Sequence, residues 1–135
     1  MTRFSRLILL LILTGFSFSG AVYAESNEVP VIDAGLGPCT ADVQVMDSGH
    51  HPIYKADVST TIRYGFAGVK RLDLDVGTNV EGKARFIGIP EKTRDMLQFT
   101  ANFQGRQNTV IMSPEENCHQ SLSIFLPDRP VTEQK

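Results

Sequence analysis

The sequence lacks most of the features that would mark a redox, nucleic-acid-binding or helical protein. It has only two cysteines, and they form no Cys-x-x-Cys pair, so a thiol redox site is not indicated. It has no run of lysine or arginine and a formal net charge of −2, which argues against nucleic acid and against an anionic membrane surface as partners. No stretch repeats apolar residues at helical spacing over three turns, and no Gly-x-Ser-x-Gly motif of a serine hydrolase is present.

The first 24 residues have the pattern of a secretory signal peptide. Arg3 and Arg6 precede an apolar run from Leu7 to Phe18, and small or tolerated residues end the segment at Ala24. The apolar run is shorter than the ~20 residues that cross a bilayer, so a retained membrane anchor is the weaker alternative. We therefore expect an extracytoplasmic protein, periplasmic or secreted, with no stable membrane insertion after signal cleavage.

The rest of the chain has the length of one domain. Residues 25–38 contain Pro30, Gly35, Gly37 and Pro38 with little periodicity, and we interpret them as an extended linker. Residues 39–127 form the predicted folded domain. The segment 128–135 is short, mostly polar and ends the chain, so we expect a disordered tail.

Within residues 39–127 the dominant signal is alternation of apolar and polar residues. This period of two is typical of half-buried β-strands. It is clearest in three sets of apolar positions: Ala41, Val43 and Val45; Ala56, Val58, Thr60, Ile62 and Tyr64; and Leu97, Phe99, Ala101 and Phe103. With the shorter runs between glycine- and proline-containing turns, the pattern predicts about seven strands. The expected fold is an all-β, antiparallel, Ig-like or prealbumin-like β-sandwich.

Charged residues also alternate around the segment from Thr78 to Gly82. Asp73 and Asp75 are predicted to face outward before it, and Lys83 and Arg85 to face outward after it. We interpret the two flanking strands as neighbours whose opposite charges pair across the sheet. This structural use accounts for the carboxylates, and no paired-carboxylate hydrolase is indicated.

The two cysteines, Cys39 and Cys118, are expected to form a disulfide. Both are predicted to reach an oxidising compartment, where free thiols are unusual. Closing a loop of about 80 residues stabilises a protein by about 4 kcal/mol in the chain-entropy description.

Several short motifs together resemble those of the carboxypeptidase regulatory-like domains, which belong to the transthyretin-like, or prealbumin-like, β-sandwiches. The matching residues are Val45-Met46-Asp47, Gly49, Pro52-Ile53, Ala56-Asp57-Val58, Leu74-Asp75-Val76, Thr78, Gly82, Phe86 and Gly88-Ile89-Pro90. The resemblance covers residues 40–127 and implies a non-catalytic accessory or binding role. One transthyretin-like branch hydrolyses 5-hydroxyisourate and has a Tyr-Arg-Gly-Ser ending, which this chain lacks.

The loop from Tyr64 to Gly68 is the first candidate binding site. Phe66 lies between two glycines, and Lys70 and Arg71 follow. Flexible loops with an aromatic residue are common recognition elements, so we expect Tyr64, Phe66, Lys70 and Arg71 to contact a partner. The alternative is structural, with Phe66 folding back over the end of the sandwich and the basic residues serving solubility.

The adjacent histidines His50 and His51 are the second candidate site. They follow Asp47 in a predicted turn, and imidazole with carboxylate can bind zinc or copper. Consecutive histidines rarely direct both rings at one ion. If the last strand runs antiparallel to the first, His119 lies at the opposite end from the turn. Exposed turn residues without a ligand are the alternative interpretation.

The sequence therefore predicts an exported, non-catalytic β-sandwich that recognises a protein or carbohydrate partner in the cell envelope or outside the cell. The alternative is a periplasmic zinc- or copper-binding protein that uses His50 and His51. A third possibility is an assembly subunit that pairs through an open sheet edge. Neither an enzymatic activity nor a cofactor is expected.

Overall fold

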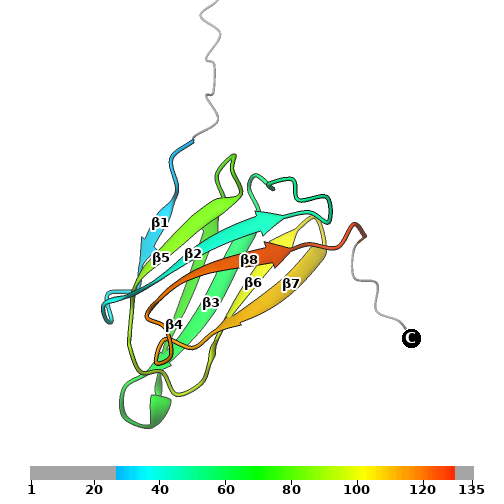
Figure 1. The fold of residues 1–135 in the computed structure, drawn as a ribbon. Helices are drawn as coiled ribbons and strands as arrows, with labels where there is room; N and C mark the ends of the chain where they lie inside the picture. Colours follow the sequence, from blue (N-terminus) through cyan, green and yellow to red (C-terminus); the bar gives the residue numbers. More distant parts are fainter. Residues whose placement is uncertain (1–26, 130–135) are drawn as a thin grey trace, which may run out of the picture.

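The computed structural model of the protein describes residues 27–129. In this range the chain forms eight β-strands and one short 3₁₀ helix, in two four-stranded sheets that pack face to face (Figure 1). The elements are β1 (Val31–Asp33), β2 (Cys39–Met46), β3 (Asp57–Tyr64), η1 (Phe66–Gly68), β4 (Lys70–Gly77), β5 (Lys83–Ile89), β6 (Leu97–Phe103), β7 (Arg106–Met112) and β8 (His119–Phe125). The predicted all-β sandwich is confirmed.

The first sheet has the strand order β1-β5-β2-β8 and mixes parallel with antiparallel neighbours. β2 runs antiparallel to β5 but parallel to β8, and β1 runs parallel to β5. Sequence patterns did not reveal these parallel pairs, nor the strand β1 within the segment interpreted as a linker. A strand of three residues is too short for alternation to show.

The second sheet has the order β4-β3-β6-β7, and all its neighbours are antiparallel. β3 pairs with β4 along its whole length, from Asp57 to Tyr64. The ladder between β3 and β6 is shorter and ends where Thr60 pairs with Phe99. Beyond that pair β3 continues without β6 as a neighbour, and this early end of the ladder shapes the candidate site described below.

The core lies between the two sheets and contains the side chains that alternation predicted to point inward. Val43, Ile62 and Leu97 are almost fully buried. Phe86 of β5 and Phe99 of β6 meet edge to face across the sandwich, with ring centroids 5.0 Å apart. Such aromatic pairs stabilise beyond the area that they bury.

The segment between β4 and β5 carries the chain from one sheet to the other. Thr78 holds its start, because its hydroxyl donates a hydrogen bond to the carbonyl oxygen of Ile53 at 2.6 Å and accepts one from the N–H of Ala56 at 3.0 Å. Asn79 is 3% exposed, and its side-chain oxygen accepts the N–H of Lys83 at 2.9 Å. These buried polar contacts stabilise a crossover where the sequence suggested a simple turn.

The expected charge pairing between β4 and β5 is therefore wrong, because these strands belong to different sheets. Asp73 accepts a hydrogen bond from Arg71 on its own strand at 3.0 Å. Arg85 donates to Asp42 on the neighbouring strand β2 at 2.5 Å. Asp73 and Arg85 thus pair with residues of their own sheets, as is usual for exposed charges.

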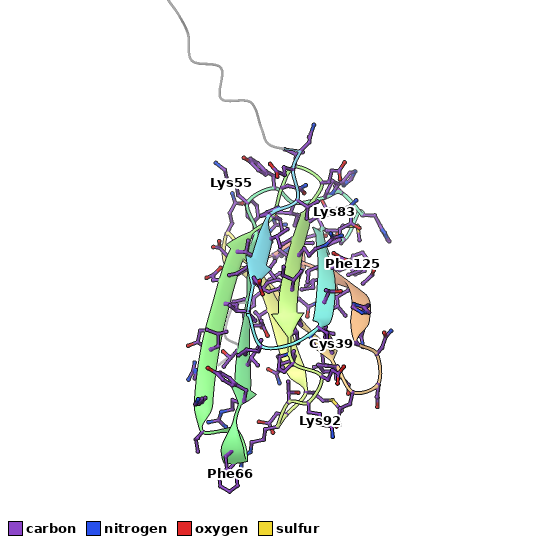
Figure 2. All side chains as sticks on the ribbon, turned by 90° about the vertical axis from the view of Figure 1, so that its left-hand side faces the viewer. Cys39, Lys55, Phe66, Lys83, Lys92 and Phe125 are labelled. Atoms are coloured by element: carbon purple, nitrogen blue, oxygen red, sulfur yellow. A yellow bond between two sulfur atoms is a disulfide. The ribbon has the colours of Figure 1, made fainter. Side chains whose placement is uncertain are left out.

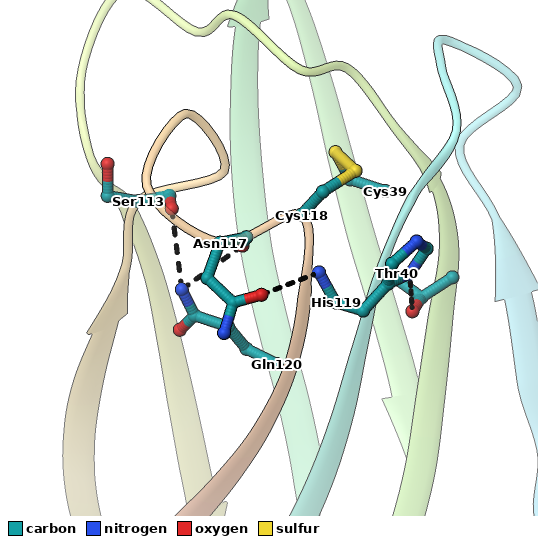
Figure 3. The surroundings of a disulfide bond; sticks show 7 residues. All are labelled: Cys39, Thr40, Ser113, Asn117, Cys118, His119 and Gln120. Carbon is teal, nitrogen blue, oxygen red and sulfur yellow. Dashed lines mark hydrogen bonds between the residues drawn. A yellow bond between two sulfur atoms is a disulfide. The ribbon is translucent and has the colours of Figure 1, made fainter.

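The predicted disulfide between Cys39 and Cys118 is present and joins β2 to β8 at the start of both strands (Figure 3). Directly after it, Thr40 pairs with His119, and the Thr40 hydroxyl lies 2.9 Å from Nδ1 of His119. Cys39 is completely buried. The bond thus fixes the register of two neighbouring parallel strands that are 79 residues apart in the sequence.

The predicted signal peptide lies outside the described residues, and so do the last six residues of the predicted tail. The domain boundaries at 39 and 127 stay predictions. Between residues 27 and 129, no helix is long and apolar enough to cross a membrane.

Candidate functional site

The predicted partner-binding residues lie together at one end of the sandwich, where β3 turns into β4. Phe66 projects from the tip of this turn, away from the body of the protein (Figure 2), and its side chain is 93% exposed. Lys70 is the strand partner of Tyr64, and its ammonium lies 5.9 Å from the centre of the Tyr64 ring. Arg71 follows on β4 and binds Asp73. The alternative in which Phe66 covers the core is therefore wrong.

A second segment, which sequence reasoning missed, supports this turn. Arg94, in the connection from β5 to β6, donates a hydrogen bond from Nη1 to the carbonyl oxygen of Ala67 at 2.8 Å. Its aliphatic stem lies so close to Gly68 that a β-carbon there would meet it at 2.6 Å. Lys92 and Arg94 line a hollow beside the turn. Nothing local in the sequence connects residues 92–94 with residues 65–68, because only the sheet arrangement brings the two loops together.

The two adjacent histidines lie at the opposite end of β2 from the disulfide, and their rings point to different partners. The ring of His50 packs edge-on against Phe125, with centroids 5.1 Å apart. Nδ1 of His51 lies 3.2 Å from both carboxylate oxygens of Asp47. His119 is hydrogen-bonded near the disulfide. The histidines are thus not arranged around one ion.

Asp47 organises the histidine turn. One carboxylate oxygen accepts the backbone N–H groups of Gly49 and His51, each at 2.9 Å. The hydrogen bond from the His51 backbone, the nearby imidazole and the Gly49 N–H together hold the pKa of Asp47 below its usual value of 3.8. The carboxylate is therefore ionised at neutral pH, and its contacts account for it as a turn-forming residue.

A polar cleft lies on the outer face of the second sheet, at the point where the β3–β6 ladder ends. It has a volume of about 410 Å³. Its lining comes from β3, from the start of β6 and from the residues just before it: Ser59, Thr60, Thr61, Arg63, Asp95, Met96, Leu97, Gln98 and Thr100. We call this site the β3–β6 cleft. It combines hydroxyl, amide, guanidinium and carboxylate groups with an exposed apolar side chain, Met96.

One wall of the β3–β6 cleft is held by a polar network on the sheet surface. The Thr61 hydroxyl donates to Asp73 on β4 at 2.6 Å, and Arg71 donates to the same carboxylate oxygen. The hydrogen bond from Thr61, followed by that from Arg71, lowers the pKa of Asp73. The hydroxyl groups of Thr100 and Thr109 lie 2.9 Å apart on the other side. Thr61 and Thr100 are therefore fixed in orientation.

Thr60 lies in the lining of the cleft and carries an unusual buried group. The residue is 4% exposed, and its hydroxyl has no hydrogen-bond partner among the described residues. A buried hydroxyl without a partner costs about 1–3 kcal/mol of desolvation. This unpaired hydroxyl belongs to the last residue of β3 that pairs with β6.

Replacing Thr60 with valine, which has nearly the same shape, is expected to raise the free energy of unfolding by about 1–2 kcal/mol, because it removes the unpaired hydroxyl. Urea unfolding of both proteins measures the change. Thr100→Val is the matched control, and it is expected to lower stability slightly since it breaks the bond to Thr109. A loss of stability in Thr60→Val would show that the Thr60 hydroxyl has a partner.

No protein-family model and no curated protein matches the chain. Solved structures do match. A catechol 1,2-dioxygenase from Pseudomonas arvilla C-1 superposes with a TM-score of 0.54 at 14% identity, over 81% of this chain and 62% of that one. A variant of the catechol 1,2-dioxygenase from Acinetobacter radioresistens gives a TM-score of 0.50 at 12% identity, over 81% and 63%. The chain thus spans less than two thirds of these enzymes.

These similarities correct two expectations. The chain was expected to be a non-catalytic accessory or metal-binding protein and to have no enzymatic activity, but the solved structures that share its fold are enzymes. Sequence identity this low establishes the fold alone, and a fold can host many activities. The resemblance to carboxypeptidase regulatory-like domains, and the role of Tyr64, Phe66, Lys70 and Arg71 in binding, stay predictions.

An iron centre built from histidines and a carboxylate, as many non-haem oxygenases use, does not fit the described residues. Such centres commonly hold iron with two histidines and a carboxylate. Over residues 27–129 there is no group of three or more histidine, cysteine, aspartate or glutamate side chains that could hold a metal ion. We derive no chemical step through a metal.

Proposed function

We propose that this protein is an enzyme that acts on a small hydroxylated aromatic molecule, such as catechol, bound in the β3–β6 cleft. The observation that carries this proposal is the cleft itself, which has about 410 Å³ and several polar groups converging on it. Sites for small molecules in proteins commonly enclose about 300–1,000 Å³. The substrate class is supported by the fold, since the similar solved structures are named as catechol dioxygenases.

The chemistry of the lining suits such a molecule. Gln98 and Ser59 offer neutral donors and acceptors to aromatic hydroxyl groups. Arg63 and Asp95 add one charge of each sign, so a hydroxyl between them can donate to the carboxylate and accept from the guanidinium. Met96 is 59% exposed, and its thioether makes a favourable contact with an aromatic ring. These groups would orient and polarise the bound hydroxyls.

We also propose that the protein works in an oxidising space outside the cytoplasm. The disulfide between Cys39 and Cys118 supports this location, because such bonds persist where the environment is oxidising. The signal-peptide pattern of residues 1–24 supports it independently.

Calorimetric titration tests the substrate class. Catechol is expected to bind, and phenol, which lacks one hydroxyl, to bind about ten-fold more weakly, because a group that bonded that hydroxyl is left without a partner. Gln98→Ala is expected to weaken catechol binding by a similar factor. Asp95→Asn, which removes the charge but keeps the size, should weaken it further.

Matched controls make the same substitutions on the outer face of the second sheet, but outside the β3–β6 cleft. Gln107→Ala on β7 and Asp75→Asn on β4 change exposed residues that do not line the cleft, and both are expected to leave catechol affinity unchanged. Absence of catechol binding at millimolar concentration would contradict the proposal, and equal losses in the control variants would place the site outside the cleft.

A further inference from the structure

The turn from Gly65 to Val69 presents an apolar tip with nothing packed over it. Phe66 is 93% exposed and Val69 is 76% exposed, more than the other large apolar side chains between residues 27 and 129. Figure 2 shows Phe66 at the extreme end of the sandwich, with Lys92 on the neighbouring loop. Exposed apolar side chains that are grouped and ringed by polar ones mark contact surfaces. This tip shares two residues with the β3–β6 cleft proposal: Arg63, which lines both hollows, and Asp95, which lines the cleft.

The surface around the tip is basic, although the protein as a whole is acidic. Residues 63–71 and 91–95 contain five basic and two acidic side chains, a formal charge of +3, whereas the whole chain carries −2. The basic residues are Arg63, Lys70, Arg71, Lys92 and Arg94, and the acidic ones are Glu91 and Asp95. Only Arg71 among these cations forms a salt bridge within the described chain. The other four cations, less the carboxylates of Glu91 and Asp95, leave a formal charge of +2 for a ligand.

The cations surround a hollow next to the apolar tip. Arg63, Lys92 and Arg94 line it together with the glycines of the turn, and its volume is about 520 Å³. Backbone and side-chain donors in such a hollow suit phosphate oxygens. The hollow therefore matches a charged headgroup, while Phe66 beside it matches an apolar layer.

The turn is held in this exposed form. Ala67 has a positive φ of 56°, and Gly65 and Gly68 also adopt positive φ. Backbone hydrogen bonds from Gly68 to Gly65 and from Val69 to Phe66 close the turn, and Arg94 binds its outer carbonyl. Phe66 is therefore presented by a defined backbone conformation.

We propose that this tip docks reversibly on the surface of an anionic phospholipid bilayer. Phe66 and Val69 enter the boundary between headgroups and acyl chains, and Arg63, Lys70, Lys92 and Arg94 contact the phosphates. Aromatic side chains favour this boundary, and basic residues near it add attraction to anionic lipids. Once Arg71 is paired with Asp73, the tip carries a formal charge of +2, and its complementarity to a negative surface favours this partner although the overall charge of the chain argued against it.

Sedimentation of the purified protein with lipid vesicles tests the proposal. We expect binding to phosphatidylglycerol vesicles, little binding to phosphatidylcholine vesicles, and loss of binding as salt is raised. Phe66→Ala is expected to lower the partition coefficient about ten-fold. Lys92→Gln is expected to lower it about five-fold, the usual effect of one cation near the surface.

Two control variants remove comparable groups away from the tip. Ile111→Ala changes another exposed apolar residue, on β7, and Lys55→Gln removes a cation at the opposite end of the sandwich (Figure 2). Both are expected to bind phosphatidylglycerol like the unaltered protein. Equal binding to both lipids, or equal losses in the controls, overturns the proposal. Absence of vesicle binding at low salt also overturns it. None of these variants alters Gln98 or Asp95, so failure here is distinguishable from failure of the catechol titration.

Discussion

Replacing Cys39 and Cys118 together by alanine is expected to lower the free energy of unfolding by about 4 kcal/mol. The disulfide joins two residues that are 79 positions apart in the sequence. Without it the unfolded chain regains the conformational entropy that this loop closure removes. Small domains have a net stability on the order of 5–15 kcal/mol, so the loss is a large part of the total. Urea unfolding of the oxidised protein and the double variant measures it.

Reduction of the unaltered protein separates the cross-link from packing. Cys39 is fully buried, so the alanine variant also loses sulfur contacts in the core. The reduced protein keeps both sulfur atoms and loses only the bond. We expect reduction to account for most of the effect, and a change below 1 kcal/mol would contradict the role assigned to the bond.

Replacing Phe86 with alanine is expected to destabilise the protein by about 3–5 kcal/mol. Phe86 is completely buried and meets Phe99 of the opposite sheet with ring centroids 5.0 Å apart, so its loss leaves a cavity at the interface of the two sheets. Thermal and urea unfolding measure the change. Phe66→Ala is the matched control, because the same substitution at a 93% exposed position should change stability by less than about 0.5 kcal/mol. Similar effects at both positions would contradict the assignment of the core.

Alternation in the sequence was enough to predict the class of fold and much of the core. Val43, Ile62 and Phe99 occupy every-other positions in runs long enough to show a period of two, and all are buried. The disulfide followed from the cysteine count and the signal-peptide pattern. These features depend on local spacing or composition, which a single sequence displays directly.

Strand partners could not be predicted in the same way. The segment from Thr78 to Gly82 has the composition of a hairpin turn, yet it crosses between sheets, and there the Thr78 hydroxyl binds the carbonyl of Ile53, 25 residues away in the sequence. The parallel pairing of β2 with β8 likewise joins segments far apart in the sequence. Such contacts are set by tertiary structure, and an alternating pattern does not say which strand lies next to which.

The candidate site was predicted only in part. Phe66, Lys70 and Arg71 were chosen from one continuous segment, and the structure keeps them near one another. Lys92 and Arg94 were not predicted to lie beside these residues, because they belong to a different loop. The β3–β6 cleft arises where a ladder ends at Thr60, and the end of a ladder leaves no mark in a sequence whose alternation continues on both strands.

The proposed function depends most directly on where catechol contacts the protein. Amide chemical shifts of the ¹⁵N-labelled protein, recorded during a catechol titration, give that location residue by residue. The account predicts concentration-dependent shifts confined to residues 59–63 and 95–100, on both sides of the β3–β6 cleft. Shifts centred on the Asp47 to His51 turn or on the Phe66 tip, or no shifts at all, would contradict it.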